Sequence, residues 1–339
     1  MLLAGVLFQP RASVEAWDVK ESDFSAINST DGRLKFLLNY AILAPSSHNS
    51  QPWKFNVTGN EIKVFADKTR WLQISDADQR ELYISTGCAL ENLLIAADHF
   101  GNNADVRYFP NASRDDLVAS VELTPGSLPA DSDSRLFQAI LARHTNRNLY
   151  EDRAIARKDI QALMNISTEG TDLYLSSDPD IRSKFMRLVT AADQVQYANQ
   201  DYKSELGYWL GQGVMGPTGI QAKIAQMYVL FLDTGAGQTK KDATAVNSTP
   251  VLGFISTREN DRASQVKAGQ LLERLWLKAT AMGIQVHPMS QALKVPETKS
   301  ELRELLPQKG LYPQQTFRLG YASPEGEHTP RRPLNEVIK

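Results

Sequence analysis

The chain has 339 residues, of which 42% are hydrophobic and 22% charged, so a disordered or collagen-like protein is excluded. Lys and Arg total 37 against 39 Asp and Glu, and this formal net charge of −2 lacks the basic excess typical of proteins that bind the nucleic-acid backbone. A single cysteine, Cys88, excludes an internal disulfide and any metal site that needs several thiolates.

The N-terminus carries a short apolar run, Leu2 to Phe8 (LLAGVLF), with no Lys or Arg before it. A secretory leader has a basic region before a longer apolar core, and a membrane span needs about 20 apolar residues. The run therefore favours a terminal segment that packs or frays, with a truncated export signal as the alternative. We expect a soluble, cytoplasmic protein, or an exported form if the run is the remnant of a leader.

The first part of the chain predicts two helices and four strands. The first helix stops at Ala44-Pro45, where proline disfavours continuation, and Thr58-Gly59-Asn60 predicts a hairpin turn. The second helix is strongly apolar and ends on Gly101. In chain order the elements are helix 35–43, strands 53–57 and 62–66, helix 87–101, and strands 106–109 and 118–123.

A second series begins after a segment rich in Pro, Gly, Ser and Asp, residues 125–134, which is the best linker in the chain. The series ends with a Pro- and Arg-rich tail. In chain order its elements are helices 136–142 and 159–164, strand 173–176, a mainly helical stretch 180–226, a strand or core segment 228–232, strand 251–256, helix 269–283 and strand 316–321.

The helices 87–101 and 269–283 form an internal repeat, because each lies upstream of a strand and downstream of a helix–strand pair. They match at Gly87/Gly269, Leu90/Leu272, Glu91/Glu273, Leu93/Leu275, Ala97/Ala279 and Gly101/Gly283. Two related α+β halves follow, with expected bounds 20–125 and 135–339. The second half is longer by roughly 60 residues, mostly at about 180–240, and an insertion of that length is typical of a lid.

The segment Ala44–Trp53 (APSSHNSQPW) is the most informative motif. It places small polar side chains and two prolines in a short, stiff loop, which suits the edge of a planar polar ligand. A helix-terminating turn is the alternative. It explains Pro45 and the serines but not the order Asn49, Gln51, Trp53, so we favour ligand binding.

Two basic segments are candidates for anion binding. Arg143 to Arg147 (RHTNR) sets two guanidinium groups around a hydroxyl, and such groups match phosphate oxygens in pairs. In the tail, Thr329 to Pro333 (TPRRP), two prolines stiffen the backbone around two arginines. A solvated basic turn and a frayed tail are the respective alternatives.

The other motifs in the sequence are weaker evidence for a function. The segment 211–216 (GQGVMG) fits the dinucleotide pattern GxGxxG, but no strand precedes it and Pro217 interrupts the helix that should follow. No GxSxG elbow supports Ser46 or Ser47 as a nucleophile, and the five histidines lack the spacing of metal ligands. We therefore expect no Rossmann cofactor site, no hydrolase triad and no metal.

Taken together, these segments resemble the flavin-dependent nitroreductase family, and specifically its fused branch, in which two nitroreductase-like halves lie in one chain. The resemblance covers about residues 30–338. APSSHNSQPW looks like the family's hallmark loop, and RHTNR is similar to the Arg-x-Ser-x-Arg segment that opens a nitroreductase domain. Residues 283–290 fall where the family has its flavin N5-contacting loop, and RLGYASPEGEHTPRRPL resembles the closing strand and basic tail.

The resemblance implies an α+β fold in which a mixed or antiparallel sheet flanked by helices occurs in each half, and the halves form a pseudo-dimer within one chain. It implies FMN at the interface, held by the loop of the first half and the basic segments of the second. Carried over, the candidate cofactor-binding residues are Pro45, Ser46, Ser47, Asn49, Gln51, Arg143, Thr145, Arg147, Pro288, Met289, Ser290, Gln291, Arg331 and Arg332.

The sequence departs from the family pattern in two complementary ways. The first half has no Arg-x-Ser-x-Arg before its loop, and the second half has no hallmark loop around Ile166–Asp172. Each half lacks what the other supplies, which predicts one composite FMN site per chain. His287 and Ser290 stand where an acidic residue is common in the family.

The function implied is hydride transfer from NAD(P)H through flavin N5 to a nitroaromatic, a quinone or a similar acceptor, which requires no side-chain acid or base. We therefore assign no catalytic residue, and we expect a monomer because the dimer is fused. The alternative is an FMN-storage protein in which the insertion, rich in aromatic residues (Tyr197, Tyr202, Tyr208, Trp209), closes the site. Core packing is the other explanation for these aromatic residues.

Overall fold

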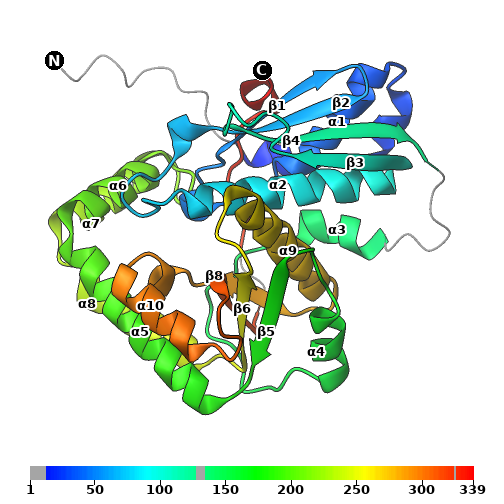
Figure 1. Cartoon of the computed structure of the whole chain (residues 1–339). Coiled ribbons are helices and arrows are strands. Elements are labelled where there is room, and N and C mark those ends of the chain that lie inside the picture. The colour runs from blue at the N-terminus through cyan, green and yellow to red at the C-terminus, as the bar shows by residue number, and fades with distance from the viewer. Residues whose placement is uncertain (1–12, 127–133, 324–325) are drawn as a thin grey trace.

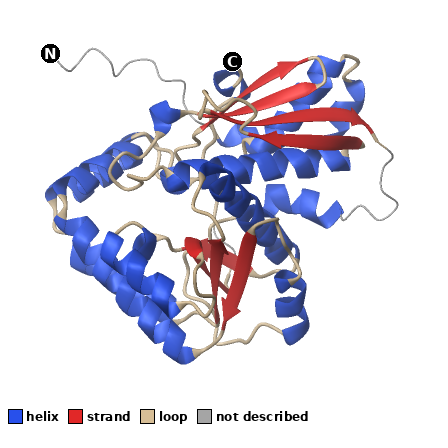
Figure 2. Cartoon of the chain, viewed as in Figure 1, coloured by secondary structure: helices blue, strands red, loops and turns tan. Residues whose placement is uncertain are grey.

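The computed structural model describes residues 13–126, 134–323 and 326–339. The apolar run 2–8 and most of the expected linker lie outside these ranges. The described chain contains two four-stranded antiparallel sheets (Figures 1 and 2). The first has the order β1 (Trp53–Thr58), β2 (Glu61–Ala66), β4 (Leu117–Pro125), β3 (Asn102–Tyr108). The second has the order β5 (Thr171–Ser176), β6 (Val251–Thr257), β8 (Tyr312–Gly320), β7 (Gln285–Pro288).

The two sheets have the same topology, because the first four and the last four strands pair in the same order. In each half one long helix connects the second strand to the third: α2 (Arg80–His99) in the first and α9 (Arg262–Ala281) in the second. The predicted α+β class with antiparallel sheets and flanking helices is confirmed. The helix repeat inferred from the glycines corresponds to α2 and α9, although both helices begin about seven residues before the glycine.

The helices α2 and α9 pack against each other between the sheets (Figure 1). Gly87 and Gly269 lie at their contact. A Cβ on Gly87 would overlap the carbonyl oxygen of Val266, and a Cβ on Gly269 would overlap the carbonyl oxygen of Ile84. Val266 lies three residues before Gly269, and Ile84 lies three residues before Gly87. Each helix therefore makes the same contact with the other. The halves are therefore related by a pseudo-twofold axis through this crossing.

One hydrophobic core joins both halves, because side chains of α2, α9 and both sheets belong to a single cluster that includes Trp53 and Trp276. Helices α1 (Thr30–Ala41), α3 (Ser134–Ala142) and α4 (Arg157–Met164) pack around it, and α11 (Leu334–Val337) lies beside β1. None of the described helices combines the length and apolar character needed to cross a membrane.

The insertion of the second half replaces a hairpin turn. Where Gly59-Asn60 joins β1 to β2, four helices join β5 to β6: α5 (Pro179–Ala198), α6 (Gln200–Gly211), α7 (Gly219–Phe231) and α8 (Gly235–Asn247). Helices α5 and α8 pack with α10 (Pro296–Leu305) over the second sheet, around Phe185 and Phe254. The α6–α7 hairpin extends from them toward the first half (Figure 1).

One predicted element is wrong. Residues 228–232 were expected as a strand or core segment, but they form the end of α7, with Tyr228 and Phe231 more than half exposed. A short apolar run has no periodicity that separates strand from helix, and here the helix that begins at Gly219 continues through it. Strand β7 and helix α10 were not predicted.

Candidate functional site

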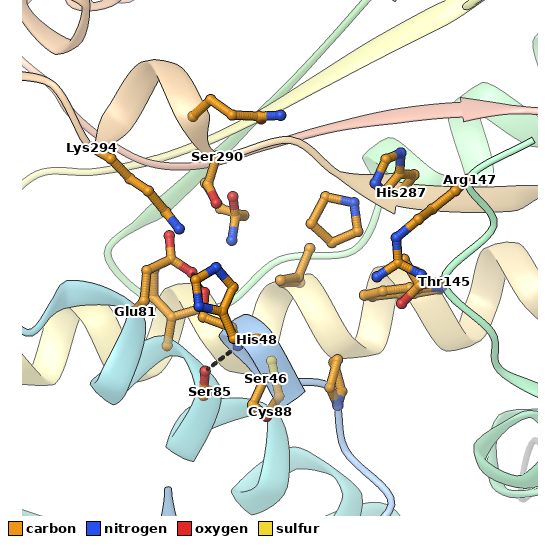
Figure 3. Close-up of a pocket in the computed structure, with 18 of the residues that line it drawn as sticks. Ser46, His48, Glu81, Ser85, Cys88, Thr145, Arg147, His287, Ser290 and Lys294 are labelled. Atoms are coloured by element: carbon orange, nitrogen blue, oxygen red, sulfur yellow. Dashed lines mark hydrogen bonds between the residues drawn. The ribbon is translucent and has the colours of Figure 1, made fainter. Parts of the chain in front are cut away.

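Three adjoining cavities lie between the halves, and His48 and Arg147 line all three. The central cavity, about 210 Å³, is lined by residues that include Pro45, Ser46, Glu81, Trp276, His287 and Lys294 (Figure 3). The basic cavity, about 380 Å³, is lined by residues that include Asn49, Arg143, Thr145, His328 and Arg331. The lid cavity, about 670 Å³, is lined by residues that include Asp193, Tyr197, Tyr202, Lys240, Lys241 and Asp242.

The loop 44–53 forms one wall of the central cavity and has a strained backbone. His48, Asn49 and Gln51 have φ values of 50°, 48° and 51°, in the left-handed region that side chains other than Asn and Asp avoid. Hydrogen bonds fix it: Ser46 Oγ accepts from Gln51 N at 2.9 Å, and Ser47 Oγ donates to Glu81 at 2.8 Å. The small polar side chains of the loop therefore hold its backbone rigid.

Asn49 and Gln51 connect this loop to the C-terminal tail. Asn49 Nδ2 donates to the carbonyl oxygens of Val214, at 2.6 Å, and Pro330, at 2.9 Å. Gln51 is fully buried, and its Oε1 accepts from Arg332 N at 2.6 Å. Asn49 therefore joins the first half both to the tail and to the loop between α6 and α7.

Two buried guanidinium groups converge at the basic cavity. Arg143 Nη2 and Arg331 Nη2 both donate to the carbonyl oxygen of Leu43, at 2.9 and 3.0 Å. Both side chains are 97% buried, and the Nε of each has no hydrogen-bond partner among the described residues. Burial lowers the pKa of both groups, and Arg143 lowers that of Arg331 further, yet an arginine remains protonated in proteins.

Glu273 is the buried carboxyl group closest to this pair, with Oε1 3.5 Å from Arg143 Nε. Burial raises the pKa of Glu273 to about 7, in spite of Arg143. Near neutral pH this carboxyl group is therefore only partly ionised, so its negative charge balances less than one of the two positive charges of the arginines. A buried site with uncompensated positive charge and free N–H donors suits an anion with several oxygens, such as a phosphate.

His287 lies on the opposite side of the central cavity, beside Arg147 (Figure 3). Its Nδ1 accepts a hydrogen bond from Arg318 Nε at 3.0 Å. Because an arginine only donates, the neutral imidazole must carry its proton on Nε2. Burial and the charge of Arg318 lower the pKa of His287 well below its usual range, so the ring is a neutral donor at physiological pH.

The sequence reasoning did not select His48, Glu81 or Lys294 for the site. In Figure 3 His48 and the ammonium group of Lys294 both lie near Glu81. Burial and Lys294 lower the pKa of His48 to about 3, and its buried Nδ1 has no partner among the described residues. His48 lies within the loop that was singled out. Glu81 comes from the start of α2 and Lys294 from the turn before α10, and neither carries a local motif.

Comparison with known proteins agrees with this architecture. No family model matches the chain. A Mycobacterium tuberculosis protein provisionally named an NAD(P)H nitroreductase is 28% identical over 318 residues, which cover 90% of this chain and 91% of that protein. The chain is nitroreductase-like. A second such protein, PigM of Serratia sp., is 25% identical over 342 residues, covering 92% and 95% of the two chains.

Two further comparisons concern a relative of uncharacterized function and a solved nitroreductase structure. An M. tuberculosis relative of uncharacterized function is 28% identical over 325 residues, covering 90% and 92% of the two chains. The crystal structure of the FMN-dependent nitroreductase NfnB from Mycobacterium smegmatis with NADPH is 15% identical, covers 62% of this chain and 99% of its own, and has a TM-score of 0.43. A fused branch of nitroreductases is not confirmed.

Most residues that the nitroreductase resemblance selected meet at the cavities, and their role in binding remains a prediction. Those that line the central cavity are Pro45, Ser46, Ser47, Thr145, Arg147, Pro288, Ser290 and Gln291. Those that line the basic cavity include Asn49, Arg143 and Arg331.

Gln51, Met289 and Arg332 do not line the three cavities. Arg332 Nη1 donates to the carbonyl oxygen of Gln51 at 3.0 Å and lies 3.4 Å from Asp67. The amide of Met289 donates to the carbonyl oxygen of Thr316 at 2.8 Å, and its side chain belongs to the core of the second sheet. These contacts fasten the tail and the loop that follows β7.

Proposed function

We propose that the protein binds one FMN per chain between its halves and is an NAD(P)H-dependent oxidoreductase that reduces a nitroaromatic, a quinone or a similar acceptor. The observation that carries the proposal is the buried pair Arg143 and Arg331, which faces a cavity continuous with the hallmark-like loop. The sequence relatives named NAD(P)H nitroreductases support the reaction class. The protein would act as a monomer in the cytoplasm.

The residues present fit the parts of FMN. A phosphate in the basic cavity would receive the unused N–H groups of Arg143 and Arg331 and the hydroxyl of Thr145. The flat ring would occupy the central cavity, where Pro45 to Ser47 and the residues after β7 face each other. Asn49 and Arg143, which come from different halves, line the same cavity, as a composite site requires.

One site per chain follows from the asymmetry of the halves. In the first half residues 42–52 separate α1 from β1 and form the loop of the site. At the equivalent place in the second half, residues 165–170 separate α4 from β5, too few to form such a loop. We therefore propose that residues 20–125 and 135–339 act as unequal halves around a single flavin.

FMN, when bound, supplies hydride exchange with the nicotinamide and with the acceptor. The chain orients it and tunes its electronics. Arg147, at the junction of the three cavities, would stabilise negative charge on the reduced ring. His287 replaces the acidic residue common in the family, and its fixed Nε2–H would donate a hydrogen bond toward the ring.

Storage of FMN is the second candidate function. It is favoured by the loop between α6 and α7, which lies against the site: Val214 accepts from Asn49, and Met215 lines both the basic and the lid cavities. A chain that holds FMN under such a cover would protect it and turn over slowly.

The experiment is titration of the purified chain with FMN, followed by NAD(P)H oxidation with a nitroaromatic or a quinone. We expect one FMN per chain and a rate well above that of free FMN. Two FMN per chain would contradict the composite site, and a rate no higher than that of free FMN would favour storage.

Arg143→Ala tests the site directly, because the phosphate would lose a charged pair of donors. We expect FMN affinity to fall by about a hundredfold or more. Arg107→Ala is the matched control, since Arg107 is an exposed side chain on β3 and its removal should leave affinity unchanged. Equal affinity in both variants would remove Arg143 from the site.

A further inference from the structure

The lid cavity is the largest of the three and is walled mainly by the inserted helices α5, α6 and α8. Its volume of about 670 Å³ is within the usual range for small-molecule sites. It opens onto the central cavity, since His48, Arg147, Tyr202, His287 and Gln291 line both. A molecule in the lid cavity would therefore lie next to a flavin ring in the central one.

Positive charge is in excess in the lid cavity. Lys240 and Lys241 are consecutive residues of α8, both exposed, and neither ammonium group pairs with an acidic group of the described chain. His48 and His287 are neutral, because burial lowers the pKa of both. Among the described residues that line the cavity, carboxyl groups come from Asp193 and Asp242 alone.

Asp193 of α5 and Asp242 of α8 form a buried carboxyl pair that shares a hydrogen bond. Two buried carboxyl groups in contact do not both ionise at neutral pH, so there the pair retains one proton. Gln238 and Gln291 donate to Asp242 Oδ2 at 2.9 and 3.2 Å. Burial and Asp242 raise the pKa of Asp193 to about 8.

Asp193 is thus the protonated partner, and no amide, hydroxyl or cationic group of the described chain donates to it. Its Oδ2 is buried and without a partner there, at the wall of the cavity. Because the proton is held between the two carboxyl groups, the pair adds one negative charge to this wall instead of two. The other titratable groups around the pair are Tyr197, Tyr202, His48, His287, Arg147, Lys240 and Lys241.

We propose that the lid cavity binds a small aromatic anion, its charged group held by Lys240 and Lys241. The rings of Tyr197 and Tyr202, edge to face with centroids 5.6 Å apart, supply an aromatic wall. The inference deepens and rests on the proposed function, because it makes this anion the electron acceptor: an aromatic carboxylate with a nitro or carbonyl oxygen.

The phosphates of a dinucleotide are a second source of organic anion, and the test separates the two. Isothermal titration calorimetry measures 4-nitrobenzoate, its neutral analogue 4-nitrobenzamide, and NADP⁺ against the purified oxidised chain. The variants are Lys240→Gln/Lys241→Gln and the control Lys223→Gln, an exposed lysine of α7 whose ammonium group donates to Gln226 of the same helix. All three positions are on the surface, so folding is not at risk.

We expect 4-nitrobenzoate to bind the native chain and the control, and to bind the double variant about tenfold more weakly. The neutral amide should bind all three chains equally. The proposal is overturned if nitrobenzoate and nitrobenzamide bind alike, if neither binds, or if only NADP⁺ binding responds to the double variant, which assigns the lysines to a dinucleotide.

The carboxyl pair is tested by pH. As pH rises through about 8 the pair becomes doubly ionised and repels the anion. We expect nitrobenzoate affinity to fall across this range in the native chain and to stay level in Asp193→Asn. Parallel profiles would contradict an effect of this carboxyl pair on the bound anion. FMN titration by absorbance is separate, so loss of FMN binding with intact nitrobenzoate binding would reject only the proposed function.

Discussion

The strained loop 44–53 shows how single residues position the site. His48, Asn49 and Gln51 hold left-handed backbone, at a cost of about 1–2 kcal/mol for a side chain that does not favour it. Asn tolerates this conformation best, and Asn49 is also the residue whose side chain reaches the tail and the α6–α7 loop. Backbone preference and side-chain contact therefore select the same residue.

Asn49→Ala should destabilise the chain by about 2 kcal/mol, because two hydrogen bonds are lost and Ala disfavours the left-handed region. Urea unfolding measures the effect. Asn247→Ala, at the exposed end of α8, is the matched control and should change stability by less than about 0.5 kcal/mol. Equal effects would mean that the contacts of Asn49 contribute nothing.

Glu273 should make stability pH-dependent. Burial raises its pKa from 4.5 to about 7, so the folded chain holds this proton more tightly than the unfolded chain does. The contribution of this proton to the free energy of unfolding is complete below pH 4.5. It is lost as pH rises through 7, which lowers the free energy of unfolding by about 3 kcal/mol. In FMN-free protein Glu273→Gln should flatten this part of the unfolding profile. Parallel profiles for the two chains would contradict the prediction.

At the same scale, the sequence could indicate some functional residues and not others. Pro45, Ser46 and Asn49 stand in one segment whose order is informative by itself, and Arg143 stands in a second. Glu81 and Lys294 reach the central cavity from the start of α2 and the turn before α10. Each is one charged residue among many, and only tertiary packing brings them together.

The contact between α2 and α9 shows why certain glycines are needed in the elements. At Gly87 and Gly269 the backbone of the opposite helix occupies the place of a Cβ atom. The glycine spacing in the sequence marked both helices, but their true starts, Arg80 and Arg262, lie in stretches without a clear apolar period. The repeat was visible because close packing constrains glycine, whereas helix starts are constrained only by local capping.

Gly87→Ala should separate α2 from α9 and cost about 3 kcal/mol or more, because backbone cannot yield as a side chain does. Gly237→Ala is the matched control within α8, where a Cβ meets no atom within 4 Å. There the change should be neutral or stabilise by up to about 1 kcal/mol. Thermal unfolding of both variants decides, and a similar loss in each would show that the crossing tolerates a methyl group.

Over the whole molecule, two sheets of equal topology meet around one core, and a single interruption distinguishes them. The four inserted helices occupy the position of a two-residue turn, so they leave the sheet order unchanged. The excess length of the second half revealed this insertion in the sequence. Its internal structure was less accessible, because α7 is apolar on a face that stays exposed, with Ile220 and Phe231 at 80% and 71%.

The α6–α7 hairpin can be removed to ask whether it gates the site. Its ends are adjacent, since a Cβ at Gly235 would lie 2.9 Å from Tyr197 Cβ, so a short Gly-Ser linker can replace residues 200–233. Arg143, Arg331 and Thr145 lie outside the hairpin, and one FMN per chain should still bind. Iodide should quench the flavin more strongly, because Tyr202 and Met215 no longer cover it.

Turnover of this deletion separates the two candidate functions. If the chain is a reductase whose acceptor occupies the lid cavity, loss of Tyr202 removes part of that cavity, and kcat/KM with a nitroaromatic carboxylate should fall. This is the outcome we expect, and it is measured as NAD(P)H oxidation per bound FMN. A rise in turnover above that of the intact chain would instead identify the hairpin as a cover over stored flavin, since removing a barrier accelerates a reaction only where that barrier limits it.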